Sequence, residues 1–132
     1  MDTSAPSLIL IVDDETKIRR IVASNLERAG YDVISAADGM HALEILELQY
    51  PKPALVLMDV MMPELDGLSA TRAIRGMDRP DAQLPIIAMT ANLFEEDVAA
   101  CLAAGMDAHI PKPLEAGQMI RTIAEWLERK KQ

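Results

Sequence analysis

The chain has 132 residues, of which 50% are hydrophobic and 26% charged, a composition typical of one soluble globular domain rather than a disordered protein. Its formal charge of −8 argues against a nucleic-acid surface, because phosphate binding requires clustered Lys and Arg, and it is compatible with a monomer that binds cations. A single cysteine excludes an internal disulfide. The sequence shows no stretch long enough to span a bilayer and no secretory leader, which predicts a cytoplasmic chain or a cytoplasmic piece of a larger one.

Residues 1–7 are polar, carry Pro6, and predict a flexible N-terminus. Beyond them, continuous runs of branched apolar residues predict buried parallel strands, because such runs lack the alternation of a strand with one face in water. The predicted strands are residues 8–12, 31–36, 54–58, 86–89 and 108–110. The second of these is more polar than the others, which favours a place near an edge of the sheet.

Apolar residues at three- and four-residue spacing follow each strand and predict a helix in each interval. The stripe of the first helix consists of Ile18, Ile21, Val22 and Leu26, and Gly30 ends that helix. The second predicted helix is opened by Asp38 and Gly39 and ended by Pro51. The third is capped by Asp66 and carries Leu68, Ile74 and Met77. The fourth and fifth are predicted over about residues 93–104 and over residues 115–130.

Strands and helices alternate throughout the chain, with short connections and no internal linker. This alternation predicts the α/β class and a single doubly wound (βα)5 domain over residues 8–130. We expect a parallel five-stranded sheet of order 2-1-3-4-5, which is flavodoxin-like, with helices on both faces.

Polar side chains occur where the predicted strands end. Asp13 and Asp14 follow the first strand, Asp59 closes the third apolar run, Thr90 follows the fourth strand and Lys112 follows the fifth. Open α/β folds place their chemistry at the carboxyl ends of the strands, so we expect these side chains to converge, with Asp59 facing solvent at the rim of the sheet.

Three carboxylates within a few ångströms repel one another, and a divalent cation removes that conflict. Mg²⁺ favours carboxylates, water, a backbone carbonyl and phosphate oxygens, so Mg²⁺ is the predicted cofactor, with Mn²⁺ as an alternative. Lys112 adds a charge that can pair with a carboxylate or a phosphoryl oxygen, and Thr90 adds a hydroxyl donor. A carboxylate in this setting is a competent nucleophile toward phosphorus, which predicts an aspartyl phosphate at Asp59.

Taken in order, these residues resemble the receiver domain of two-component response regulators over essentially the whole chain. The segments that carry the resemblance are Asp13-Asp14, residues 57–63 with Asp66-Gly67, Met89-Thr90-Ala91, and Lys112-Pro113. Residues 104–114 look especially similar to receivers of hybrid sensor histidine kinases.

The resemblance implies that Asp59 takes phosphate from a phosphohistidine on a sensor histidine kinase or a phosphotransfer domain. It implies a Mg²⁺ ion held by Asp14, Asp59 and the carbonyl of Met61, with Asp13 acting through water. It also implies that Thr90 and Lys112 contact the phosphoryl group, and that the Lys112-Pro113 bond is cis.

Two positions depart from the family pattern. His109 stands where the family often has Tyr or Phe, so the switch candidates are Thr90 and His109 rather than a full aromatic switch. Met61 offers no polar side chain to orient an attacking water, which predicts a relatively long-lived phosphoryl group. The candidates for docking a partner are Ile18, Ile21 and Pro113, with core packing as the alternative for the two isoleucines.

The sequence thus predicts a phosphoacceptor signalling switch that is not an enzyme, apart from its own phosphorylation and dephosphorylation. Two alternatives stay open: a phosphate-independent adaptor of the same fold, and an aspartate-nucleophile phosphohydrolase. Met61 occupies the place where such hydrolases normally carry a second acid. We expect a monomer without nucleic-acid or membrane contacts, with a phosphorylation-dependent dimer as a further possibility.

Overall fold

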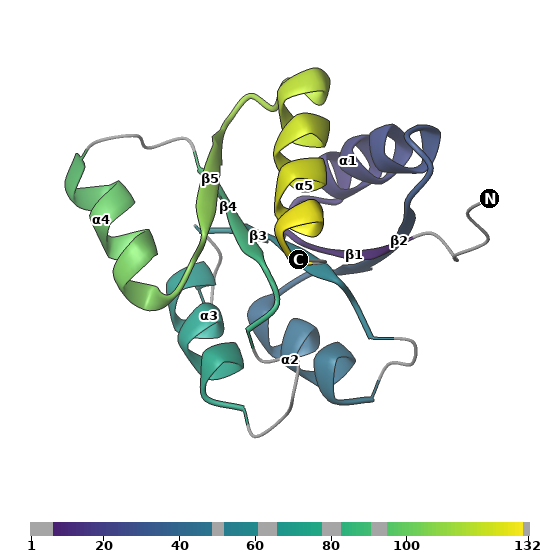
Figure 1. The fold of residues 1–132 in the computed structure, drawn as a ribbon. Helices are drawn as coiled ribbons and strands as arrows, with labels where there is room; N and C mark the ends of the chain where they lie inside the picture. The colour runs from purple at the N-terminus through teal and green to yellow at the C-terminus, as the bar shows by residue number, and fades with distance from the viewer. Residues whose placement is uncertain (1–6, 49–51, 61–65, 78–82, 91–94, 131–132) are drawn as a thin grey trace.

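The computed structural model describes residues 7–48, 52–60, 66–77, 83–90 and 95–130, in which strands and helices alternate (Figure 1). The strands are β1 (Leu8–Val12), β2 (Asp32–Ala36), β3 (Leu55–Asp59), β4 (Ile86–Thr90) and β5 (Ala108–Pro111). The helices are α1 (Thr16–Arg28), α2 (Gly39–Leu48), α3 (Gly67–Arg75), α4 (Glu95–Ala104) and α5 (Ala116–Lys130). The predicted flexible N-terminus, apart from Ser7, lies outside the described residues.

The strands form one sheet of order β2-β1-β3-β4-β5, and every neighbouring pair is parallel. This order confirms the predicted doubly wound topology. The order reverses direction at β1 and β3, where Val12 lies opposite Met58. The residues that follow β1 and those that end β3 therefore lie side by side at the carboxyl edge of the sheet, which is the position of ligand sites in such folds.

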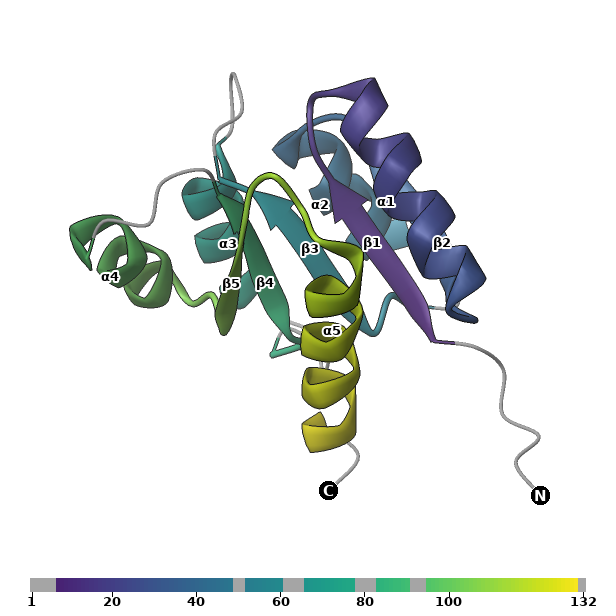
Figure 2. The same ribbon diagram turned by 90° about the horizontal axis from the view of Figure 1, so that it is seen from above.

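Helices cover both faces of the sheet, as Figures 1 and 2 show: α1 and α5 lie on one side, and α2 and α3 on the other. Ile9 and Ile11 of β1 face the core beneath α1 and α5, whereas Leu10 and Val12 face the core beneath α2, α3 and α4. Burial on both faces explains why the sequences of the strands are continuous apolar runs and do not alternate between apolar and polar residues. No helix in the described part of the chain is long and apolar enough to cross a membrane.

Specific residues set the helix ends. Gly30 has a φ of 97°, and Tyr31 N donates to Leu26 O over 3.0 Å, which closes the last turn of α1 in the left-handed conformation that glycine adopts most readily. Asp66 caps α3 by accepting a hydrogen bond from Ser69 N at 2.8 Å. Both predicted boundaries are therefore confirmed.

Three sequence predictions are adjusted by the structure. Ile21 was placed in the apolar stripe of α1, but 48% of it is exposed, because the buried face of this helix narrows to Val22 and Leu26. Helix α5 begins one residue later than predicted, since Glu115 caps it by accepting from Gln118 N. Helix α3 ends at Arg75, so Met77 packs against the core from beyond the helix rather than within it.

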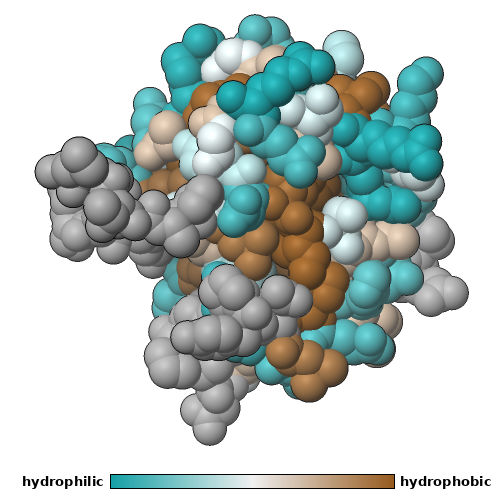
Figure 3. Space-filling model, turned by 90° about the vertical axis from the view of Figure 1, so that its right-hand side faces the viewer, coloured by the Kyte–Doolittle hydropathy of each residue, from teal (hydrophilic) through white to brown (hydrophobic). Residues whose placement is uncertain are grey.

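Strand β2 forms one edge of the sheet, as its more polar sequence predicted. The side of the molecule that carries this edge faces the viewer in Figure 3, where a band of hydrophobic side chains lies between hydrophilic surfaces. Asp32 and Ser35 are the exposed residues of β2. A short edge strand that carries polar residues is a poor template for pairing with another chain.

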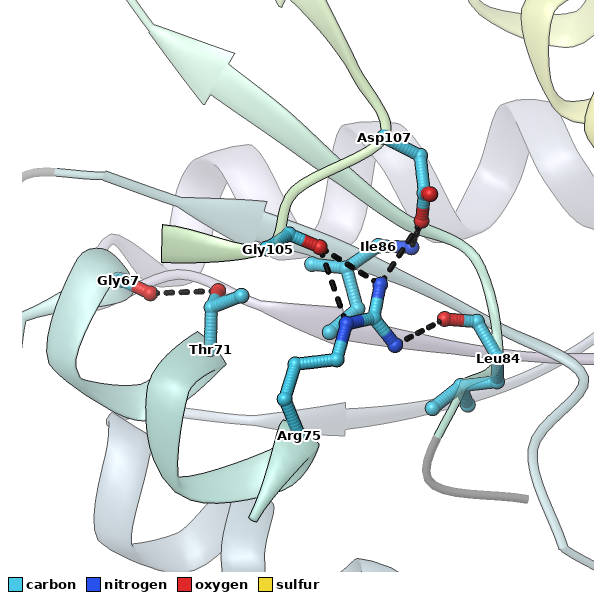
Figure 4. Close-up of polar contacts among 7 residues, drawn as sticks. All are labelled: Gly67, Thr71, Arg75, Leu84, Ile86, Gly105 and Asp107. Atoms are coloured by element: carbon cyan, nitrogen blue, oxygen red, sulfur yellow. Dashed lines mark hydrogen bonds and ion pairs between the residues drawn. The ribbon is translucent and has the colours of Figure 1, made fainter. Parts of the chain in front are cut away.

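A second polar feature lies at the end of α3, away from the residues predicted to form the site (Figure 4). Arg75 donates from Nε and Nη2 to Gly105 O and from Nη1 to Leu84 O, at 3.0, 2.8 and 2.7 Å. Its Nη2 also pairs with Asp107 Oδ2 at 2.9 Å, and the same oxygen accepts from Ile86 N. One guanidinium thus joins α3 to the start of β4 and to the turn between α4 and β5.

Candidate functional site

Three carboxylates from two neighbouring strand ends converge at the carboxyl edge of the sheet. Asp13 and Asp14 follow β1, Asp59 is the last residue of β3, and each offers an oxygen that lies within 4.8 Å of the others. We call these three residues the acidic cluster. Asp13 and Asp59 are almost fully buried, with 0% and 3% exposed, whereas Asp14 is exposed.

The burial of Asp59 corrects the expectation that this side chain faces solvent. Asp59 belongs to the central strand of the sheet, its backbone is paired with β4, and its side chain contacts Lys112. A residue at the rim of an open sheet is therefore shielded from water when side chains from adjacent strand ends pack around it.

Lys112 brings a positive charge to this cluster from the end of β5. Its Nζ lies 3.2 Å from Asp59 Oδ1 and 3.4 Å from Asp13 Oδ2. Burial alone would lower the pKa of Lys112, but the charges of Asp59 and Asp13 and the hydrogen bonds to them outweigh it, so the pKa lies above its ordinary value. The ammonium is therefore held in its charged form between two buried carboxylates.

The backbone around Lys112 fixes its approach. Lys112 N donates to Thr90 O at 2.9 Å, which extends the pairing of β4 with β5 by one residue. The Lys112-Pro113 peptide bond is cis, as the resemblance implied. Thr90 itself ends β4, is 5% exposed, and follows the β4 residue paired with Asp59. The structure thus brings Thr90 to the same edge as the acidic cluster.

The two aspartates after β1 are held differently. Asp13 N donates to Ala36 O at 3.2 Å, and Asp13 Oδ1 accepts from Glu15 N at 2.8 Å, so both its backbone and its side chain are constrained. Within the described residues, the Asp14 carboxylate makes no hydrogen bond or ion pair. Asp14 is thus the exposed member of the cluster and the one whose side chain is least restricted.

The remaining predicted site residues lie outside this cluster. His109 is an exposed residue of β5, Pro113 is exposed, and α1 carries the half-buried Ile18 and the more exposed Ile21. The carbonyl of Met61, which was predicted to bind the metal, lies outside the described residues.

Gly67 contributes to the site in a way that was not predicted. A Cβ at this position would lie 2.9 Å from Val60 Cα and closer still to the carbonyl oxygen of Asp59. Gly67 N donates to Val60 O at 3.1 Å, and Gly67 O accepts from the buried Thr71 hydroxyl at 2.7 Å. The start of α3 therefore packs directly against the backbone of Asp59, which only glycine allows. The sequence showed a glycine after Asp66 but gave no sign of this contact.

The donor set fits a hard divalent cation. Carboxylate oxygens are the ligands that Mg²⁺ prefers, and three of them are available within one small region. When all three are ionised, the Lys112 ammonium offsets one negative charge and a divalent cation would offset the other two. The same arrangement would place a phosphoryl group beside a carboxylate, an ammonium and a hydroxyl.

Comparison with known proteins points to one family. The model described as the response regulator receiver domain matches residues 9–124. A probable transcriptional regulator, ycf27, of Cyanophora paradoxa is 40% identical over 121 residues, which cover 92% of this chain and 48% of that protein. Sensor histidine kinase RcsC of Salmonella typhi is 37% identical over 130 residues, which cover 97% of this chain and 13% of that protein. The chain thus spans about half or less of the length of these curated relatives.

Solved structures agree with this assignment. Chemotaxis protein CheY4 of Vibrio cholerae superposes with a TM-score of 0.86 at 30% identity, covering 92% of this chain and 99% of that one. The receiver domain of sensor histidine kinase PA1611 from Pseudomonas aeruginosa superposes with a TM-score of 0.84 at 36% identity, covering 94% and 99%. The structure of that domain contains a magnesium ion coordinated in its active site cleft.

Proposed function

The chain belongs to the response regulator receiver domain family, and from this premise we propose that Asp59 is its phosphoacceptor. Receiver domains of response regulators and hybrid kinases are phosphoacceptors in two-component signalling. The observation that carries the assignment is the central place of Asp59. It lies between the aspartates that follow β1 and the Thr90 and Lys112 side chains at the ends of β4 and β5.

The proposed reaction is transfer of a phosphoryl group from a phosphohistidine. An Asp59 carboxylate oxygen attacks phosphorus, a P–O bond forms, and the P–N bond breaks with its electron pair passing to the imidazole nitrogen. The Lys112 ammonium, already 3.2 Å from Asp59, pairs with the negative charge of the incoming phosphoryl oxygens. The Thr90 hydroxyl donates a hydrogen bond to one of those oxygens. Positioning and charge neutralisation are the main requirements of such transfers.

Mg²⁺, or Mn²⁺ in its place, is the proposed cofactor. Asp14, Asp59 and the carbonyl of Met61 would bind it directly and Asp13 through water. When bound, the cation would neutralise charge on the phosphoryl oxygens. The convergence of three carboxylates supports this set, as does the magnesium ion in the similar PA1611 receiver domain.

Residues 8–130 are the proposed receiver unit. Its proposed partners are a sensor histidine kinase or a histidine phosphotransfer domain, with Ile18, Ile21 and Pro113 at the docking surface. The exposure of Ile21 and Pro113 supports this surface. Thr90 and His109 are proposed to change position when Asp59 is phosphorylated. A single buried cysteine fits a reducing, cytoplasmic location for this monomeric unit.

The two alternatives are not favoured. A phosphate-independent adaptor would not require the ion pairs of Lys112 with Asp59 and Asp13, which the structure forms. A phosphohydrolase would not be expected to match the receiver family over residues 9–124.

Phosphorylation by radiolabelled acetyl phosphate with Mg²⁺ tests the assignment. We expect Asp59→Asn to reduce labelling to background, since an amide is not a nucleophile toward phosphorus. Asp32→Asn, at an exposed residue of β2, is the matched control and should be labelled as wild type is. Chelation of Mg²⁺ should also abolish labelling. Undiminished labelling of Asp59→Asn would show that another residue is the acceptor.

A further inference from the structure

An arginine on α1 contacts the backbone that carries the two aspartates of the β1–α1 turn. Arg19 Nη1 donates to the carbonyl oxygen of Asp13 at 2.7 Å, and Nη2 donates to Thr16 Oγ1 at 3.1 Å. The side chain is half-buried and reaches back over the first turn of its own helix. The charge-assisted bond to Asp13 is short, as expected for a guanidinium donor.

This contact constrains the peptide unit on which Asp14 depends. The carbonyl of Asp13 and the N–H of Asp14 belong to the same planar peptide group, so holding one fixes the plane of the other. The Asp14 carboxylate is exposed and makes no polar contact of its own in the described part of the chain. No contact of the side chain itself therefore orients this carboxylate, and its backbone is what fixes the point from which the side chain reaches the rest of the acidic cluster.

We propose that Arg19 is a positioning residue for the metal site, acting through the Asp13–Asp14 peptide to direct the Asp14 carboxylate toward the cation. The inference builds on the proposed function, in which Asp14 is a metal ligand. Outer contacts that orient a ligand are part of the binding energy of a metal site, because they remove the cost of ordering that ligand.

Charge and positioning predict opposite effects of removing Arg19. A guanidinium near a cation site repels the cation, so loss of the charge alone should tighten Mg²⁺ binding. Loss of the hydrogen bond to Asp13 O instead frees the peptide and should weaken Mg²⁺ binding. The sign of the change in affinity therefore separates the two roles.

The experiment is calorimetric titration of the unphosphorylated protein with Mg²⁺. Arg19→Met should raise the Kd about tenfold, at the lower end for residues that orient a metal ligand. Arg20→Met is the matched control: Arg20 is the next residue of α1, is exposed, and makes no polar contact within the described structure. It removes the same charge and should leave the Kd unchanged or slightly lower. Arg19→Lys, which keeps one cationic donor, should bring the Kd part of the way back.

Binding of Mg²⁺ by Arg19→Met that is as tight as, or tighter than, binding by Arg20→Met overturns the inference. If Arg19→Met does not fold, Arg19→Gln and Arg20→Gln are compared by the same criterion. If wild type binds no Mg²⁺, the proposed metal role fails, and the constraint of Arg19 on the Asp13–Asp14 peptide is tested separately in the metal-free protein. In that protein, ¹⁵N relaxation should give a lower amide order parameter for Asp14 in Arg19→Met than in wild type, and no change in Arg20→Met. Equal order parameters in the two variants overturn the inference.

Discussion

The positive charge of Lys112 offsets the energetic cost of burying two carboxylates at one site. Its ammonium lies within 3.4 Å of two carboxylates that are almost inaccessible to water, and its own side chain is 20% exposed. Burial opposes its charge, but Asp59 and Asp13 outweigh that effect and raise the pKa of Lys112 above its ordinary value in the folded protein. Because the folded-state pKa is the higher one, the stabilisation is fully present below the unfolded pKa and is lost as pH rises through the folded pKa.

We therefore expect Lys112→Met to lower the free energy of unfolding by about 1–3 kcal/mol at neutral pH, since it leaves two buried carboxylates without their cation. The deficit relative to wild type should stay constant up to about pH 10 and shrink above it. Urea unfolding of both proteins across this range measures it. Lys17→Met, an exposed lysine on α1, is the control and should show no such deficit. A deficit that persists undiminished at high pH would contradict the role of the ion pairs.

Gly67 acts on the site through its lack of a side chain. Gly67→Ala should destabilise the protein by about 1–3 kcal/mol, because the added Cβ collides with the backbone of Asp59 and Val60. It should also slow phosphorylation, since the backbone of Asp59, the proposed acceptor, must shift. Gly76→Ala at the other end of α3 is the matched control: its φ is −87° and its Cβ would meet nothing closer than 3.5 Å. Thermal unfolding and labelling by acetyl phosphate measure both effects, and equal behaviour of the two variants would refute the contact.

At the scale of elements, α3 is fixed at both ends. Its first residue packs against the backbone of Asp59, and its last, Arg75, is bonded to the turn between α4 and β5 (Figure 4). Gly105 allows this approach because a Cβ there would lie 2.9 Å from Arg75 Cγ, and its φ of 109° also suits glycine. One helix therefore connects Asp59, the proposed phosphoacceptor, to the far end of the sheet.

Loss of the Arg75 contacts should loosen that end locally. Arg75→Met should lower the free energy of unfolding by about 1–3 kcal/mol, because the carbonyl oxygens of Gly105 and Leu84 lose the donor of three partly buried hydrogen bonds. Amide hydrogen exchange should accelerate at Met106 and Asp107 more than in β1. Arg72→Met, an exposed arginine on the same helix, should change stability by no more than about 0.5 kcal/mol. Uniform acceleration throughout the sheet would instead indicate a global effect.

The elements were largely predictable from sequence, and the contacts between them only in part. Apolar runs and strand–helix alternation predicted the strands, the helices and the α/β class, because burial on both faces leaves a strong local signal. The sheet order was inferred from the doubly wound arrangement typical of that class, and the structure confirms it. The meeting of Asp13 with Asp59 followed from that topology. The Arg75 contacts to Gly105 join residues 30 apart through backbone carbonyls, which carry no sequence signal. The approach of Lys112 to Asp59 was predicted as well, but the burial of Asp59 was not, because it depends on how closely the side chains from several strand ends pack around it.

At the scale of the whole molecule, the charge balance explains why a cation should matter for folding. The chain carries a formal charge of −8, and three of its carboxylates are gathered at one edge of the sheet. Folding concentrates negative charge there, which the unfolded chain avoids. Any ion that binds this edge only in the folded state must raise the free energy of unfolding. General screening by salt relieves the repulsion too, but without requiring a particular carboxylate.

Addition of Mg²⁺ should therefore stabilise the protein by about 1.4 kcal/mol when its concentration is ten times the Kd, and chelation should reverse the gain. Sodium chloride at matched ionic strength corrects for screening, which acts on every charge. Asp14→Asn removes a proposed ligand that is exposed and so leaves the core undisturbed. This variant should keep its response to sodium chloride and lose most of its response to Mg²⁺. Denaturant unfolding with each salt measures the two responses. An equal Mg²⁺ gain in wild type and Asp14→Asn would mean that the ion acts on the net charge and not at the acidic cluster.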